Sequence, residues 1–361
     1  NGRAYKQEEL LDIGKYKVVR VGNFNTNEKW YFSDLELETD KYMDDGDLLY
    51  LWATSFGPVI WQGEKAIFHY HIWKLKNFES LEKKYLYSFL EWDKNKISQN
   101  TNGSTMVHIT KNMIEQRVIE YPTKSEQYKI GSLLESVDNL ITLHQRKYDA
   151  LKTMKKTLLS KIFPKDGEDI PEIRFKGFTD AWEQRKLGDI ADIVGGGTPS
   201  TAVSEYWDGD IDWYAPAEIV DQIFVNSSQK KITTEGLNNS SAKMLPVGTV
   251  LFTSRAGIGK TAILTKEGCT NQGFQSIIPN KDELDSYFIF SRTDELKRYG
   301  ETVGAGSTFV EVSGKQMANM TISIPTTMGE QRQIGTHFRN LDNLITLHQR
   351  RSSRIIGLSA A

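Results

Sequence analysis

The spacing of apolar positions predicts one long helix in the middle of the chain. From Glu126 to about Ile162, apolar residues recur every seven positions, and others follow four residues after them. A helix of that length would extend for about 55 Å, because each residue adds ~1.5 Å. The apolar seam consists of Ile130, Leu134, Val137, Ile141, Tyr148, Leu151, Leu158 and Ile162, and it is interrupted at His144.

The same segment occurs a second time near the end of the chain. Residues 126–146 match residues 330–350 at 13 of 21 positions, and the run DNLITLHQR is identical in both copies. The offset is 204 residues, and a fainter likeness upstream pairs Gly46 with Gly248 and Gly57 with Gly259. Two helices with matching seams are expected to pair. The seam of the second copy contains Ile334, Phe338, Leu341, Ile345, His348 and Ile355.

A nearly constant helical segment follows each of two divergent globular units. This arrangement indicates a shared helical support for two units with different binding surfaces. The stretch PKDGEDIPEIRFKGFTD, with two prolines and two glycines, is typical of a linker. Residue 1 aligns with about residue 203, so we expect the first unit to lack the counterpart of Trp182 to Ala202 and the second helix to be short. The predicted parts are a first domain (1–125), a first spacer helix (126–163), a linker (164–184), a second domain (185–329) and a second spacer helix (330–361).

Strand-like runs dominate both globular units. Examples are Ala66 to Leu75, Gly248 to Ser254 and Thr321 to Ile324, and the helical stretches between such runs are short. These patterns predict a mixed α/β (α+β) fold with curved sheets in each domain.

Composition places the chain among ordinary globular proteins. Hydrophobic residues make up 39% and charged residues 25%, and no apolar run approaches the ~18 residues of a membrane span. The absence of an export signal and the single cysteine, Cys269, favour a cytoplasmic location. The net charge of −2 is unusual for a protein that grips DNA alone, so DNA binding would require basic residues gathered on one face or partner subunits that contact phosphates.

Several motifs permit more than one chemistry. SRAGIGKT, from Ser254, ends like a phosphate-binding loop, but Ser254 stands where that motif has its first glycine. A glycine-kinked loop that brings Arg255 and Lys260 to guanine edges or phosphates is the favoured interpretation, and a plain hairpin remains the alternative.

Two histidines and their counterparts in the second copy are a further candidate. His69 and His71, two apart on the predicted strand, could bind a metal, but no third ligand is evident. Asn271 and Gly273 occupy the corresponding positions in the second copy and flank Gln272, so variable polar contacts to bases are favoured here over a metal site. For His144 and His348, a role in helix register is favoured over a metal or pH role.

The order and spacing of these stretches resemble the specificity subunits of type I restriction-modification enzymes. The likeness rests on PEIRFKGFTDAWEQRKLGDIADIVGGGTPST, EYWDGDIDW, SRAGIGKTAI, NQGF, GSTF and IPTTMGEQRQIG, in addition to the repeat. The resemblance implies two target-recognition domains, each reading one half of a split DNA site, held apart by antiparallel helices. These helices would also dock two methyltransferase subunits and, through them, motor-nuclease subunits.

The resemblance implies a non-catalytic chain. S-adenosylmethionine, ATP and magnesium would bind to partner subunits, and this chain would bind none of them. None of the nine prolines is adjacent to another, so the Asn/Asp-Pro-Pro-aromatic motif of DNA amino-methyltransferases is missing. A coiled-coil scaffold without base-specific recognition is the alternative function.

Two sets of residues are therefore predicted to be functional. The seam residues expected to pair the helices or to contact partner subunits are Ile130, Val137, Ile141, His144, Leu151, Ile334, Leu341, Ile345 and His348. The residues expected to contact DNA are Ser55, His69, His71, Ser104, Thr105, Thr198, Ser254, Arg255, Gly257, Lys260, Asn271, Gln272, Ser307 and Thr308.

Overall fold

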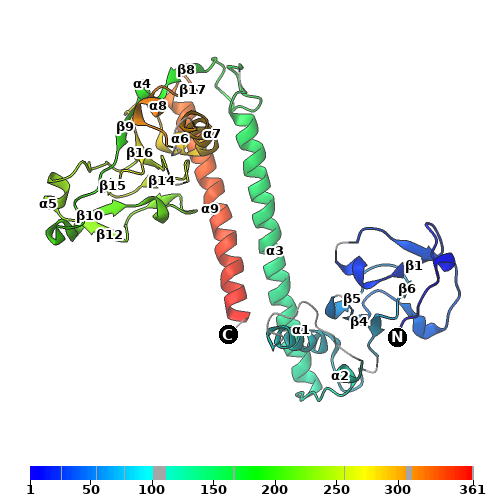
Figure 1. Cartoon of the computed structure of the whole chain (residues 1–361). Coiled ribbons are helices and arrows are strands. Elements are labelled where there is room, and N and C mark those ends of the chain that lie inside the picture. The colour runs from blue at the N-terminus through cyan, green and yellow to red at the C-terminus, as the bar shows by residue number, and fades with distance from the viewer. Residues whose placement is uncertain are drawn as a thin grey trace. The chain divides into compact units, whose positions relative to one another are not determined.

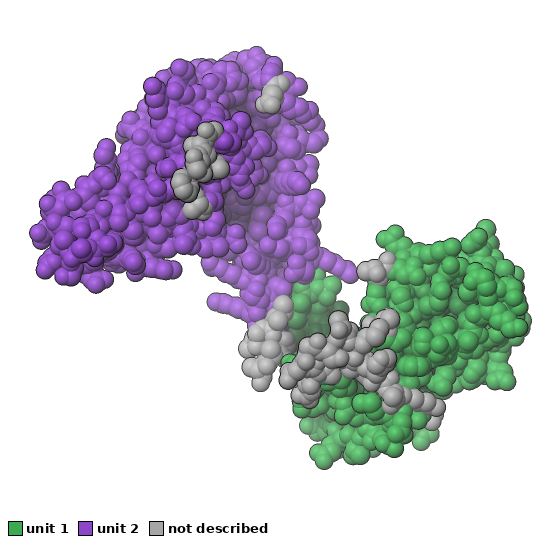
Figure 2. Space-filling model, in the orientation of Figure 1, with its two compact units in different colours: residues 1–143 green, residues 144–361 purple. Residues whose placement is uncertain are grey.

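The chain forms two compact units in the computed structural model, residues 1–143 and residues 144–361 (Figure 2). Both combine small sheets with helices, which confirms the predicted mixed α/β fold (Figure 1). Among the residues described, none of the helices has the length and apolar character needed to cross a membrane. The structure describes residues 1–25, 27–53, 55–76, 78–100, 111–165, 167–255, 257–305 and 311–359.

Two sheets form the core of unit 1. The first has the strand order β2-β1-β6-β3, and the second has the order β5-β4-β7. Apolar side chains of the second sheet, such as Tyr50 and Trp73, pack against Leu86 and Leu90 of helix α1. The strands are β1 (Tyr16–Val19), β2 (Tyr31–Ser33), β3 (Tyr42–Met43), β4 (Leu48–Trp52), β5 (Phe56–Ile60), β6 (Ala66–Phe68) and β7 (Ile72–Lys74), and the helices are η1 (Gln7–Glu9), η2 (Val21–Phe24), η3 (Thr39–Lys41), α1 (Lys83–Asn100) and α2 (Lys111–Glu115).

The expectation of one continuous strand from Ala66 to Leu75 is wrong. The chain turns at residues 69–71, where the amide of Ile72 donates to the carbonyl of His69 at 3.0 Å. The turn takes the chain from β6 in the first sheet to β7 in the second. Apolar residues lie on both sides of the turn, as the run Ala66 to Phe68 before it and Ile72 and Trp73 after it, so the local pattern alone does not reveal the break.

Three sheets form unit 2, with strand orders β11-β14-β13-β16-β9, β12-β10-β15 and β17-β8. A large apolar cluster that includes Phe252, Phe288 and Phe338 joins the first sheet to the helices. The strands are β8 (Glu183–Lys186), β9 (Ala191–Gly195), β10 (Trp207–Tyr214), β11 (Phe224–Val225), β12 (Lys230–Ile232), β13 (Val250–Phe252), β14 (Thr261–Leu264), β15 (Cys269–Thr270), β16 (Gln275–Pro279) and β17 (Thr321–Ile324). The shorter helices are α4 (Leu187–Ile190), η4 (Ser204–Tyr206), η5 (Pro216–Glu218), α5 (Thr234–Asn238), α6 (Ser286–Ser291), α7 (Thr293–Gly304) and α8 (Gly314–Ala318).

The predicted long helices are both present. Helix α3 spans Lys124–Ile162, 39 residues, and helix α9 spans Met328–Ser359, 32 residues. In unit 2 the two helices run antiparallel, because His144 meets His348 while Phe163, just after α3, stacks on Phe338 (Figure 1). Antiparallel pairing in this part of the chain is as the resemblance implied.

The seam residues have different environments along these helices. Ile334 and Leu341 are buried, with 1% and 6% of their surface exposed. Leu151 and Ile345 are partly buried against the same cluster, and the Nζ of Lys155 lies 2.6 Å from Oδ1 of Asp342. Five other residues that were predicted to pair the helices or to contact partner subunits are half-buried, namely Ile130, Val137, Ile141, His144 and His348.

Candidate nucleic-acid interface

Loops that are far apart in the sequence converge at one edge of unit 2. The hydroxyl of Thr198 donates to Oε1 of Gln272. The amide of Asn271 donates to the carbonyl of Tyr214 at 3.0 Å, and the amide of Ser254 donates to the carbonyl of Gly273 at 2.8 Å. The structure therefore brings together four of the predicted DNA contacts, namely Thr198, Ser254, Asn271 and Gln272.

The exposure of these four side chains differs. Gln272 is exposed, whereas Thr198 and Asn271 are half-buried. Ser254 has 0% of its surface exposed, and its hydroxyl has no hydrogen-bond partner in the described part of the chain. Gln272 is thus the member of this group that is most accessible to a ligand.

The segment SRAGIGKT is the loop of a β-hairpin. Strand β13 pairs antiparallel with β14, and the Thr253 hydroxyl closes the loop by accepting from the Lys260 amide at 2.9 Å and donating to the Gly257 carbonyl at 2.7 Å. A phosphate-binding loop opens a helix whose amides point at the phosphates, whereas strand β14 follows this loop. The local fold thus favours the hairpin over the phosphate loop.

Two basic side chains extend from this hairpin. Lys260 and Gly257 are exposed, and Arg255 is half-buried. In the described part of the chain, neither Arg255 nor Lys260 has a side-chain hydrogen bond or an ion-pair partner. A guanidinium and an ammonium without protein partners can form new hydrogen bonds to phosphates or guanine edges.

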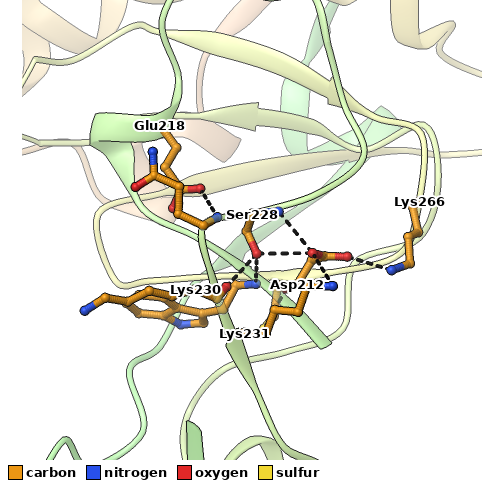
Figure 3. A network of polar contacts seen from close by, with 9 residues as sticks. Asp212, Glu218, Ser228, Lys230, Lys231 and Lys266 are labelled. Carbon is orange, nitrogen blue, oxygen red and sulfur yellow. Dashed lines mark hydrogen bonds and ion pairs between the residues drawn. The ribbon is translucent and has the colours of Figure 1, made fainter. Parts of the chain in front are cut away.

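A buried carboxylate organises the neighbouring sheet of unit 2 (Figure 3). Asp212, 1% exposed, accepts from the amide and hydroxyl of Ser228, and its other oxygen lies 2.7 Å from Nζ of Lys266. Nζ of Lys231 lies 3.5 Å from the first oxygen. Burial alone would raise the pKa of Asp212, but Lys266 and the Ser228 amide outweigh burial and hold that pKa below its usual range. The ionised carboxylate therefore holds two partly exposed lysines in place.

In unit 1, the predicted contacts lie in a hairpin and in the turn between the two sheets. Ser55 is half-buried in the β4–β5 hairpin. The rings of His69 and His71 lie 4.9 Å apart, with Trp52 beside His71 and Tyr70 beside His69. The turn thus brings the histidines together although they do not share a strand.

The two histidines are neutral near pH 7. Burial, and then the charges of His71 and Arg20, lower the pKa of His69 to about 4. Burial also lowers the pKa of His71. Among the described residues, no cluster of three or more His, Cys, Asp or Glu side chains has the arrangement of a metal site.

The remaining predicted contacts, Ser104, Thr105, Ser307 and Thr308, lie outside the described residues.

The two hairpins rest on helices in the same way, which sequence analysis missed. Gly57 and Gly259 have φ angles of +124° and +94°, which L side chains rarely adopt. A Cβ on Gly57 would meet the side chain of Lys94 on α1, and one on Gly259 would meet that of Lys297 on α7. The lysines are 203 residues apart and the glycines 202, so both partners of this contact recur at nearly the same offset as the repeat.

Comparisons with known proteins agree with the repeat. The family model described as type I restriction modification DNA specificity domain matches residues 1–153 and 179–356. The type I restriction enzyme MjaIX specificity subunit of Methanocaldococcus jannaschii is 36% identical over 167 residues, which are 45% of this chain and 38% of that relative. The chain thus matches less than two thirds of the length of this relative.

More distant relatives extend over nearly the whole chain. The MjaVIII specificity subunit of the same organism is 21% identical over 402 aligned positions, covering 97% of this chain and 93% of the relative. The solved S subunit of a type I restriction-modification system from M. genitalium has a TM-score of 0.60 and 14% identity, covering 99% of this chain and 90% of that one. The fold is therefore shared, and the chain belongs to the family of type I restriction modification DNA specificity domains.

Proposed function

We propose that this chain is the DNA-recognition subunit of a type I restriction-modification complex, in which each globular unit reads one half of a bipartite target. Two different units, each with a hairpin held by a glycine–lysine contact, are mounted on two copies of one helical segment. The combination of a repeated helical segment with divergent loops is the main observation that supports the proposal. A scaffold without base recognition does not require the loops to differ.

The first test replaces Arg255 with Ala in the chain bound to its methyltransferase subunits. If Arg255 contacts a base, affinity for the target duplex should fall by about 1–3 kcal/mol, with weaker discrimination at one position of one half-site. Arg298 is a matched control, because it lies on α7 outside the converging loops. Unchanged affinity and site preference for the alanine variants of Arg255, Lys260, Asn271 and Gln272 would contradict the assignment.

We also propose that the long helices dock two methyltransferase subunits, which carry the motor-nuclease subunits. Leucines on both helices support this, because Leu133, Leu140 and Leu143 of α3 are 65%, 47% and 46% exposed. Leu344 and Leu347 of α9 are 46% and 41% exposed. Exposed apolar side chains grouped on helices are typical of protein interfaces.

The chain itself is proposed to be non-catalytic, with S-adenosylmethionine, ATP and magnesium bound by the partner subunits. Its net charge of −2 supports weak DNA binding in isolation, and tight, salt-sensitive binding is expected once methyltransferase subunits add phosphate contacts. Titration of a bipartite duplex with and without the methyltransferase, at two salt concentrations, measures this difference. Turnover of S-adenosylmethionine by the purified chain alone would contradict it.

A further inference from the structure

A buried glutamine near the start of helix α3 holds that helix against the rest of unit 1. Gln127 has 0% of its surface exposed. Its Nε2 donates to the carbonyls of Ser80 and Pro122, at 3.0 and 2.9 Å. Its Oε1 accepts from the amide of Glu82 at 2.8 Å. Both donor hydrogens and the acceptor oxygen of the amide are thus used, which sets its orientation.

The same contacts recur in unit 2 at the start of helix α9. Gln331 is 1% exposed, its Nε2 donates to the carbonyl of Glu283 at 3.0 Å, and its Oε1 accepts from the amide of Asp285 at 3.0 Å. Glu283 and Asp285 lie 203 residues after Ser80 and Glu82, and the glutamines are 204 apart. Although the two globular units differ in sequence, the glutamine of each helix bonds the same two backbone positions.

A glycine one helical turn later allows this close approach. A Cβ on Gly131 would lie 2.7 Å from the amide nitrogen of Tyr85, and a Cβ on Gly335 would lie 2.6 Å from Oδ1 of Asp285. Either methyl group would push the globular unit away from its long helix. The glutamine and the glycine together define a single docked position in each unit.

The docked position extends to the hairpin that carries the predicted DNA contacts. In unit 1, Glu82 accepts from the amide of Tyr85 at the start of α1, and Lys94 of the same helix packs against Gly57. In unit 2, Asp285 caps α6, and the next helix, α7, places Lys297 against Gly259. Contacts therefore connect each long helix to its hairpin.

We propose that Gln127 and Gln331 are positioning residues that fix the orientation of each hairpin relative to its long helix, and thereby the spacing between the two half-sites. The spacing part rests on the proposed function. Buried polar contacts specify one geometry, because any other leaves buried hydrogen-bonding groups unpaired. Apolar contacts such as those of Ile334 tolerate small rotations.

The first experiment needs no DNA. Lys260→Cys and Arg350→Cys are spin-labelled on exposed positions of the unit 2 hairpin and of α9, and the single native cysteine, Cys269, is buried. The distance distribution between labels should broaden with Gln331→Met, which keeps the side-chain length and removes the hydrogen bonds. It should not change with Gln333→Met, at an exposed position of the same helix. Equal widths for these two variants would overturn the proposal.

A milder variant guards against loss of folding. If circular dichroism shows that Gln331→Met is unfolded, Gln331→Asn is measured instead, because it keeps a neutral amide but is one methylene shorter and does not reach both the Asp285 amide and the Glu283 carbonyl. The distance distribution should be broader than that of the unsubstituted chain and narrower than the one expected for Gln331→Met. A width equal to that of the unsubstituted chain would contradict the positioning role.

The second experiment measures spacing in the complex with methyltransferase subunits. The double variant Gln127→Met and Gln331→Met is tested on duplexes whose unspecified spacer is one base pair shorter or longer than the native one. The preference for the native spacer should fall by about tenfold, which corresponds to roughly 1.4 kcal/mol, with unchanged base preference in each half-site. An unchanged preference would overturn the positioning role. If the unsubstituted complex shows no bipartite preference, the proposed function fails while the label result still stands.

Discussion

The two units share a buried glutamine but differ at the glutamate that precedes it. Glu126 is exposed in unit 1, whereas Glu330 is 1% exposed in unit 2. Arg174 bonds both oxygens of Glu330, at 2.7 and 2.8 Å, and the indole nitrogen of Trp182 donates to it at 3.4 Å. The partners come from the segment between α3 and β8. Neighbouring identical residues of a repeat can therefore behave differently. The glutamines keep the same contacts in both units, whereas the burial of the glutamates depends on segments outside the repeat.

The largest expected effect comes from breaking this buried ion pair. Glu330→Gln should lower the free energy of unfolding of unit 2 by about 3 kcal/mol, because it removes the carboxylate partner of the Arg174 guanidinium, whose side chain is only 12% exposed. The matched change in unit 1, Glu126→Gln, should stay within about 0.5 kcal/mol, since that side chain is exposed. Urea unfolding followed by tryptophan fluorescence measures both. Similar losses for the two variants would show that the burial difference has no energetic meaning.

Substitution of the helical glycines should change stability by similar amounts in the two units, in contrast to substitution of the glutamates. Gly131→Ala and Gly335→Ala should each destabilise the chain by about 1–3 kcal/mol, because the added methyl group overlaps backbone or a capping carboxylate. Gly329→Ala is the control on α9. Its Cβ would have 3.9 Å to the nearest neighbouring atom, so the higher helix propensity of alanine should stabilise by up to about 1 kcal/mol. Thermal unfolding that ranks all three variants alike would refute the close-approach argument.

The smallest effect is the pH dependence that two histidines, one in each unit, give to stability. His69 in unit 1 should titrate at a pKa of about 4. Burial, and then the charges of His144, Lys147 and Arg351, lower the pKa of His348, whose Nδ1 lies 2.9 Å from Nδ1 of His144. Imidazole titration followed by NMR measures both groups.

The sign of the effect on stability is the same for both groups. A histidine whose pKa is lowered by folding binds its proton more readily in the unfolded chain. Its contribution to stability is complete above its ordinary value of about 6.5 and is lost as the pH falls below that value, for His69 toward about 4. Replacement of either histidine by Gln should therefore flatten the decline of the melting temperature between pH 7 and pH 5. An unshifted titration near 6.5 for His69 would contradict the burial argument.

The two long helices were predictable, because they follow from the local periodicity of apolar residues and from the sequence repeat. The seven-residue spacing from Glu126 predicted α3, and the repeat predicted α9 and its pairing with α3. The glycines beside an apolar run predicted a glycine-kinked loop at Ser254, with a plain hairpin as the alternative interpretation. The glutamine contacts were missed, although the matching letters EQ and IG in both copies were a usable signal. The heptad interpretation assigned that stretch to helix pairing alone.

The turn at residues 69–71 shows where local pattern is insufficient. Sequence periodicity favours one strand through His69 and His71, because apolar residues lie on both sides. Two different sheets receive β6 and β7, so the break depends on partners distant in the chain. Those partners are not encoded in the local spacing of apolar residues.

The sequence by itself determined the two copies of the long helical segment, their matching apolar seams and the polar character of the loops between them. These properties depend on residue spacing within one segment or on the identity of two segments. Only the tertiary structure decided that Glu330 is buried while Glu126 is exposed, that Ser254 is enclosed while Gln272 is accessible, and that a glutamine docks each unit on its helix. Burial and hydrogen-bond partners are set by which distant segments pack together, because the free energy of each contact depends on both sides of the interface.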